Sequence, residues 1–240
     1  MTLKIINVAA FTLMIVMNYL ANALPLGGKT TGELSAQYPN LFVPAGITFS
    51  IWGVIYLLLL LFCILQFMSD HREIVQSIGW LFAASCLLNA LWIVTWHYEK
   101  MALSILVMVL LLAVLTAISS RLTGFPAGIA RAAFGIYLGW ICIATIANVT
   151  ALLVAANWQG WGLSQETWAV VMILAGAVIT ILVIQNYRNP FAGLAVIWAL
   201  AGIMIARWPD NRAILVVAAV SAIAVAIITV LAAVRKPAPG

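Results

Sequence analysis

Long apolar segments limit what this chain can fold into more than any other feature. Eight of them follow one another, separated by short breaks where polar and turn residues gather. Each is close to the roughly 20 residues that a helix needs to cross a bilayer. Only 7% of the 240 residues are charged, so the chain cannot cover itself with a water-compatible surface. We therefore expect an all-α integral membrane protein with eight transmembrane helices in total.

The ends of the apolar runs set the expected helix boundaries. We place the helices near residues 5–24, 43–68, 77–97, 101–121, 128–156, 167–187, 190–207 and 212–235. The first run follows Lys4 as a signal peptide would, but Asn18, Tyr19 and Asn22 interrupt its core. The sequence "NALPLGG" after it is also a poor cleavage site, so we keep this run as a spanning helix of the mature protein.

Basic residues are divided unevenly between the two ends of the expected helices. The end with both termini carries Lys4, Arg72, Arg121, Arg131, Arg188, Arg235 and Lys236, and the other end carries Lys29, Lys100, Arg207 and Arg212. Because cytoplasmic loops are enriched in Lys and Arg, this division predicts cytoplasmic termini, in a multi-pass protein of the bacterial inner membrane. No basic run exists, so a nucleic-acid partner is not expected.

Several function classes lack the residues they need. None of the four lysines lies in the middle of an expected helix, which excludes a retinal protein of the usual kind. No Asp, Glu or Arg lies at the centre of an expected span, which disfavours ion-coupled transport. The sequence also has no Walker loop, no His-rich cluster and no G-x-S-x-G motif. The three cysteines lie in apolar runs without metal-ligand spacing, as small apolar side chains do.

Amides are the main polar groups within the expected spans. Asn18 and Asn22 share one face of the first helix, and Asn89, Thr145 and Asn148 lie within two later ones. Two interpretations stay open: hydrogen bonds between helices, or contact with a polar group of a ligand.

Large aromatic rings occur in the same helices as these amides. Trp80 and Trp96 lie at the two ends of one run, as interfacial anchors do. Trp52 and Tyr56, by contrast, lie about 14–20 Å along the helix axis from Val43, past the headgroup zone. Rings at that depth either pack between helices or line a pocket.

Three stretches resemble one membrane family. "PAGITFSIWGVIY" (44–56), "LLNALW" (87–92) and "YLGWICIATIANV" (137–149) are similar in pattern and order to helices two, three and five of the TspO, or translocator protein/tryptophan-rich sensory protein, family. The resemblance covers about residues 5–156. It implies a TspO-like five-helix bundle over residues 1–156, followed by an additional three-helix transmembrane segment over residues 157–240.

The resemblance also implies a ligand and a site. Relatives bind porphyrins and other flat hydrophobic molecules in a pocket beneath the first loop, and they often form homodimers. The ligand-binding residues implied by position are Trp52, Tyr56, Asn89, Trp92, Tyr137, Trp140, Asn148 and Phe49. The ligand expected is a non-covalent tetrapyrrole, porphyrin-like or haem-like. Two residues separate Phe49 from Trp52 where the family usually has three, so either the helix is locally rewound or Phe49 is not the equivalent ring.

Three functions follow as hypotheses. The first is a membrane receptor or sensor that binds a planar hydrophobic ligand. The second is an uncoupled facilitator or a structural membrane subunit, and the third is an enzyme that degrades a tetrapyrrole. We expect binding rather than catalysis, because no residue pattern indicates that a ligand is chemically altered. The stretch "VTALLV" after Asn148 has no Tyr and Arg, so sterol recognition is not expected.

Overall fold

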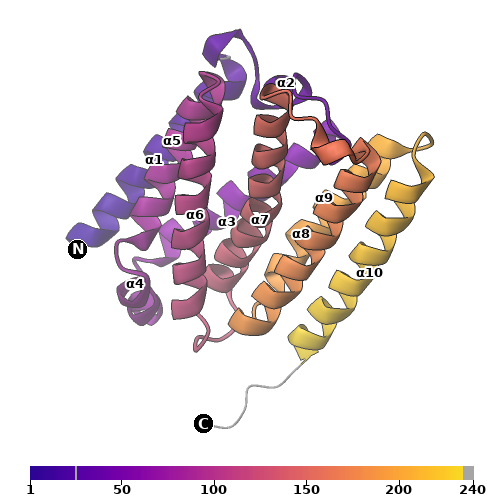
Figure 1. Ribbon diagram of the computed structural model, residues 1–240. Coiled ribbons are helices and arrows are strands. Elements are labelled where there is room, and N and C mark those ends of the chain that lie inside the picture. Colours follow the sequence, from indigo (N-terminus) through magenta and orange to yellow (C-terminus); the bar gives the residue numbers. More distant parts are fainter. Residues whose placement is uncertain (25, 235–240) are drawn as a thin grey trace.

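A computed structural model describes residues 1–24 and 26–234, and these residues form helices without any strand (Figure 1). The α-helices are α1 (Thr2–Ala23), α2 (Thr31–Ala36), α3 (Ile51–Leu65), α4 (Arg72–Ile78), α5 (Leu81–His97), α6 (Met101–Arg121), α7 (Ile129–Ala155), α8 (Gln165–Tyr187), α9 (Phe191–Arg207) and α10 (Arg212–Val234). Four 3₁₀ turns join them: η1 (Leu26–Gly28), η2 (Gly46–Ser50), η3 (Ser69–His71) and η4 (Gly160–Gly162). The all-α fold class is confirmed.

The helices are those of an integral, multi-pass membrane protein. Within the described residues, 6 helical segments are long and apolar enough to cross a bilayer, or up to 7 if the bent pair of η3–α4 and α5 counts as one span. The two parts of that pair meet at 63°, because Gly79 between them adopts a left-handed φ of 58°. Helix α9 is apolar but has only 17 residues. The number of eight crossings stays a prediction.

Expected and observed boundaries differ most in two places. The run expected at 43–68 begins with the 3₁₀ turn η2 before α3 starts, and the run expected at 77–97 is preceded by the separate helix α4. The short helix α2 was not expected at all. It is fixed by a capping box in which the Thr30 side chain accepts from the Glu33 backbone N–H and the Glu33 side chain accepts from the Thr30 backbone N–H.

Helix α7 occupies the middle of the bundle. It packs against α3 and α6 on one side and against α9 on the other, and α8 and α10 pack against α9 (Figure 1). One buried apolar cluster extends from Ala10 in α1 to Ala218 in α10. Residues on both sides of position 156 belong to this cluster. The division of the chain into a five-helix bundle and a three-helix segment at residue 156 stays a prediction.

Small residues bring the last three helices close to their neighbours. A side chain added at Gly139 of α7 would overlap the backbone of Ala192 in α9, and one added at Gly193 of α9 would overlap the Thr229 side chain in α10. Glycines thus permit close packing of these helices. The consequence is that α9 lies directly against α7, the helix that carries Tyr137 and Trp140.

Candidate functional site

Trp52 is the centre of an aromatic cluster built from three helices. Its ring stacks on Tyr56 one turn further along α3 and on Trp92 of α5, with centroid distances of 5.5 and 6.4 Å. Tyr137 and Trp140 of α7 point their edges at the same ring, at 5.9 and 6.1 Å. These are the stacked and edge-to-face arrangements that aromatic pairs prefer. The structure thus brings together five of the residues that the sequence placed in a pocket.

Phe49 joins this cluster through the 3₁₀ turn η2. Its ring meets the Trp140 ring edge-on at a centroid distance of 6.1 Å. Residues three apart nearly eclipse one another in a 3₁₀ helix, so the tight turn aligns Phe49 with Trp52 although only two residues separate them. The chain is thus locally rewound at this point, and the equivalence of Phe49 to the family's ring stays a prediction.

The amides tie helices together. Asn18 of α1 donates to the Asn89 side-chain oxygen at 2.8 Å, and the Asn89 amide donates to the Tyr137 hydroxyl at 2.9 Å. This chain of hydrogen bonds joins α1, α5 and α7 behind the aromatic rings. In the same way Ser104 of α6 donates to Asn148 of α7 at 2.8 Å. Interhelical bonding therefore engages one amide atom of Asn18 and of Asn148 and both amide atoms of the completely buried Asn89. Asn22 instead donates within α1, to the Asn18 carbonyl.

Two cavities border the aromatic cluster. The wide cavity, of about 320 Å³, lies between α1, α2, α3 and α5, and the narrow cavity, of about 50 Å³, lies between α2, α3, α5 and α7. Phe49, Trp52, Trp92 and Thr31 line both cavities and separate them. Among the other implied site residues, Tyr56 lines the wide cavity and Trp140 and Asn148 line the narrow one, whereas Asn89 and Tyr137 line neither and lie behind the rings.

Four buried polar atoms around these cavities have no hydrogen-bond partner within the described residues. They are the Tyr56 hydroxyl and the indole Nε1 atoms of Trp92, Trp96 and Trp140. The three tryptophans are only 7%, 4% and 3% exposed, and all three line the narrow cavity. Buried donors are nearly always satisfied in native proteins. The site therefore offers several donors to an acceptor group that enters it.

The expected position of Trp96 in an interfacial belt is wrong. The sequence placed it in an interfacial belt because it lies at the end of its run, but its ring is buried and stacks on Trp92 at 5.9 Å. The physical reason is the connection between α1 and α3, which folds over this end of α5 and covers the ring: Tyr38 packs on Trp96 at 6.3 Å. Trp80, at the other end of the run, is 61% exposed as expected. The i, i+4 spacing of Trp92 and Trp96 places both rings on one face of α5, but their burial depends on the connection that covers them.

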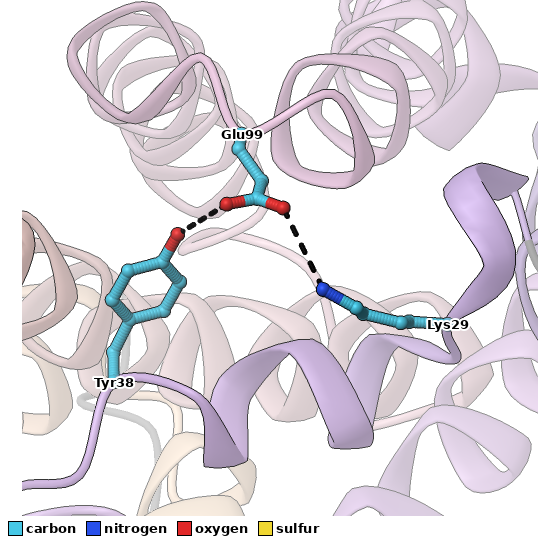
Figure 2. Close-up of polar contacts among 3 residues, drawn as sticks. All are labelled: Lys29, Tyr38 and Glu99. Carbon is cyan, nitrogen blue, oxygen red and sulfur yellow. Dashed lines mark hydrogen bonds and ion pairs between the residues drawn. The ribbon is translucent and has the colours of Figure 1, made fainter.

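The connection between α1 and α3, with α2 at its centre, covers the cavities and is fastened to the α5–α6 turn. The Tyr38 hydroxyl donates to the Glu99 carboxylate at 2.8 Å, and the Lys29 ammonium lies 3.8 Å from the other oxygen of that carboxylate (Figure 2). Partial burial, together with the hydrogen bond and the negative charge of Glu99, raises the pKa of Tyr38 to about 12. At the other side of α2, hydrogen bonds from Thr30 lower the pKa of the Glu33 carboxyl. We call this segment, residues 26–45, the lid.

Helix α9 holds the base of the lid and the turn η2. The Ala45 N–H donates to the Gly202 carbonyl at 3.0 Å, and the Trp198 indole donates to the Thr48 carbonyl at 2.9 Å. Arg207 donates to the Val43 carbonyl at 2.9 Å. A side chain at Gly202 would overlap that of Thr48. Helix α9 thus fixes the turn that carries Phe49, a contact that apolar patterning cannot reveal.

A comparison with protein families agrees with this architecture. The family model described as TSPO-like protein matches residues 4–232. The chain belongs to the TSPO-like protein family. The matched range runs through the bundle around Trp52 and through α8, α9 and α10 alike, so the family model includes α9, the helix that holds the base of the lid. No curated protein and no solved structure shows a significant match to this TSPO-like chain.

His, Cys, Asp and Glu side chains are scattered in the described part of this TSPO-like protein. No group of three or more His, Cys, Asp or Glu side chains within residues 1–24 and 26–234 is arranged to hold a metal ion. The three cysteines are buried and unpaired. What the site does offer is flat aromatic surface and uncharged hydrogen-bond donors, which suits the binding of a planar apolar molecule with acceptor atoms.

Proposed function

We propose that the protein is a receptor-like or sensor-like membrane protein that binds a planar hydrophobic ligand, such as a porphyrin, beneath the lid. The observation that carries this proposal is the set of unpartnered donors around two adjoining cavities. Tyr56 and Trp92 line the cavity of about 320 Å³, and Trp92, Trp96 and Trp140 line the one of about 50 Å³. Stacked indoles suit a flat ring system, and the donors suit the acceptor atoms at its edge. Membership of the TSPO-like family supports the same proposal.

A tetrapyrrole fits the chemistry of the site but is large for the volume of the two cavities. Small-molecule pockets usually have volumes of about 300–1,000 Å³, so the wide cavity alone is at the small end of that range. Phe49 and Trp52 separate it from the narrow cavity, and a macrocycle requires these two rings to move apart. No charged side chain lines either cavity. The carboxylates of a porphyrin would therefore lie at the lid, where Lys29 is partly exposed.

Titration of the purified protein with protoporphyrin, followed by quenching of tryptophan fluorescence, tests the proposal. Trp140→Phe keeps an aromatic ring but removes one donor, so we expect the Kd to rise by up to about tenfold, which corresponds to one hydrogen bond of about 1 kcal/mol. Trp80→Phe, at an exposed ring far from the cavities, is the matched control and leaves the Kd unchanged. Equal Kd values for wild type and Trp140→Phe would show that the pocket is assigned wrongly.

Illumination of the porphyrin complex distinguishes a protein that only binds the ligand from an enzyme that degrades it. A bound porphyrin whose absorption spectrum survives illumination supports a receptor or sensor. Bleaching that depends on the protein, and that is lost in Trp52→Phe, would instead support a tetrapyrrole-degrading enzyme.

We also propose that both termini face the cytoplasm, that the membrane is a bacterial inner membrane and that the protein forms a homodimer. Among the described residues Lys4, Arg72, Arg121, Arg131 and Arg188 lie at the end of the termini, against four basic residues at the other end; Arg235 and Lys236 lie outside the described residues. An impermeant maleimide should label Ser164→Cys in intact spheroplasts but not Thr123→Cys. A mass of one chain in detergent would exclude the homodimer.

A further inference from the structure

A second large cavity lies closer to the C-terminal end of α7 than the Trp52 cluster does. Its volume is about 400 Å³, and it is enclosed by residues 39–42 of the lid, the end of α7, the turn η4 and the start of α8. It shares no lining residue with the wide or the narrow cavity. We call it the α7–α8 cavity. Its position at the ends of two helices places it near the edge of the apolar part of the bundle.

Three tryptophans stiffen one wall of this cavity. Trp158, Trp161 and Trp168 contact one another edge-on, with centroid distances between 4.9 and 5.8 Å. The Trp168 indole donates to the Gly160 carbonyl at 2.9 Å, which fixes the ring against η4. Trp158 and Trp168 line the cavity. Because their rings are held by one another, this wall is preformed rather than assembled around a ligand.

The backbone of the same connection is strained. Asn157 and Trp161 both adopt a left-handed φ, of 52° and 51°, although neither is glycine. Such conformations cost energy and are concentrated at binding sites and other functional positions. Here the left-handed Trp161 directs the chain back over the cavity, between Gly160 and Gly162, which also have positive φ.

The lining has two chemically different parts. The helical walls are apolar, with Leu153 and Val154 from α7 and Ala169 and Met172 from α8. The opening carries uncharged polar side chains, which are Asn40, Gln159, Ser164 and Gln165. No Lys, Arg, His, Asp or Glu lines the cavity. An anionic head group would find no counter-ion there, and a cationic one would find no carboxylate.

We propose that the α7–α8 cavity binds an uncharged amphiphile from the bilayer, with its apolar chain along Leu153 and Met172 and its hydroxyl or carbonyl groups at Gln159 and Gln165. The amides supply donors and acceptors to such a head group without any net charge. The site is independent of the pocket beneath the lid, because the two share no residue. The two sites approach each other through the lid and through α7, since Phe42 and Thr150 line this cavity and Val43 and Ala147 line the narrow one.

Photo-crosslinking of the full chain in nanodiscs tests this proposal. The probe is a monoacylglycerol with a diazirine in its acyl chain, and the charge control is the fatty acid with the same chain. We expect adducts to be concentrated in the peptides that contain residues 150–172, and the yield there to be roughly tenfold higher for the uncharged probe than for the anion. Equal yields for both probes, or adducts spread evenly over the lipid-facing helices, would overturn the proposal.

Two variants at neighbouring positions separate filling of the cavity from general effects of a new indole. Met172→Trp places a large ring in the cavity, whereas Val171→Trp places it on the exposed side of α8. The first should lower the adduct yield roughly tenfold, and the second should leave it unchanged. If both yields equal that of wild type, the cavity is not the site.

A third variant removes only the polar contacts. Gln159→Ala with Gln165→Ala changes two exposed side chains and so leaves the fold intact. It should lower the yield with the uncharged probe several-fold while protoporphyrin binding persists. An unchanged yield would contradict the assigned head-group site. Trp140→Phe, which tests the pocket beneath the lid, should leave the adduct yield as in wild type, so the two proposals fail independently.

Discussion

Around Trp52, large rings from three helices leave two cavities and several unpartnered donors, whereas α9 meets its neighbours through glycines that leave no room for a methyl group. The first region has free volume and unused hydrogen-bonding capacity. The second also has unpartnered polar atoms, on Thr48, Thr229 and Arg207, but these lie at close contacts between helices. Tight packing of α9 against α7 and η2 holds the edges of the ring cluster in place, so the cavities persist beside a rigid support.

We expect the largest loss of stability from a substitution at the contact between α7 and α9. Gly139→Ala would place a methyl group on the Ala192 backbone, which cannot move without displacing α9. We expect the free energy of unfolding to fall by about 1–3 kcal/mol or more, as overpacking does in well-packed cores. Thermal unfolding in detergent measures it. Gly53→Ala in α3, where a methyl group meets no atom within 4 Å, is the matched control and should be neutral. Identical melting of Gly139→Ala and wild type would refute the tight α7–α9 contact.

Apolar patterning predicted most helices well, because six of the eight apolar runs are each one helix and polar residues mark their ends. Apolar patterning could not predict the bend at Gly79, because a single glycine inside an apolar run occurs in continuous helices as well as at breaks. Within the site, the stripes of Trp52 and Tyr56, and of Tyr137 and Trp140, were predicted to meet. The burial of Trp96 and the contacts of α9 with η2 depend on segments that lie far apart in the chain. No pattern local to either segment encodes them.

The contact between α9 and η2 links the two regions, and a smaller effect is expected there. Gly202→Ala pushes on the Thr48 side chain, which can rotate or shift, so stability should fall less than in Gly139→Ala. The displaced turn carries Phe49 away from Trp140. We therefore expect a changed near-ultraviolet circular dichroism signal and a Kd for protoporphyrin raised about five- to tenfold, equal to about 1 kcal/mol.

Gly46→Ala is the matched control for this variant, because it lies on the same 3₁₀ turn but faces open space. Its spectrum and Kd should equal those of wild type. A Gly202→Ala protein with an unchanged aromatic signal would mean that α9 does not position the rings, and the two regions would then be independent.

The smallest effect on stability is expected at the lid, because the side chains that bind it to the α5–α6 turn are partly exposed. The pKa of Tyr38 is about 12, above its ordinary value of 10.0, so the folded state holds this proton more tightly than the unfolded state does. The stabilisation that Tyr38 contributes is therefore complete below pH 10 and is lost as the pH rises from about 10 to 12. Exposed polar pairs of this kind contribute at most about 1 kcal/mol.

Glu99→Gln removes the negative charge but keeps an oxygen that accepts from Tyr38, so this pKa should move down toward 10 and stay above it because the ring remains partly buried. Tyrosinate absorbance during an alkaline titration measures the shift. Glu166→Gln, an exposed carboxylate that contacts Asn211 instead, should leave the titration as in wild type. If Glu99→Gln also leaves it unchanged, burial alone sets the Tyr38 pKa, and the lid is held by the packing of Tyr38 on Trp96 rather than by the carboxylate.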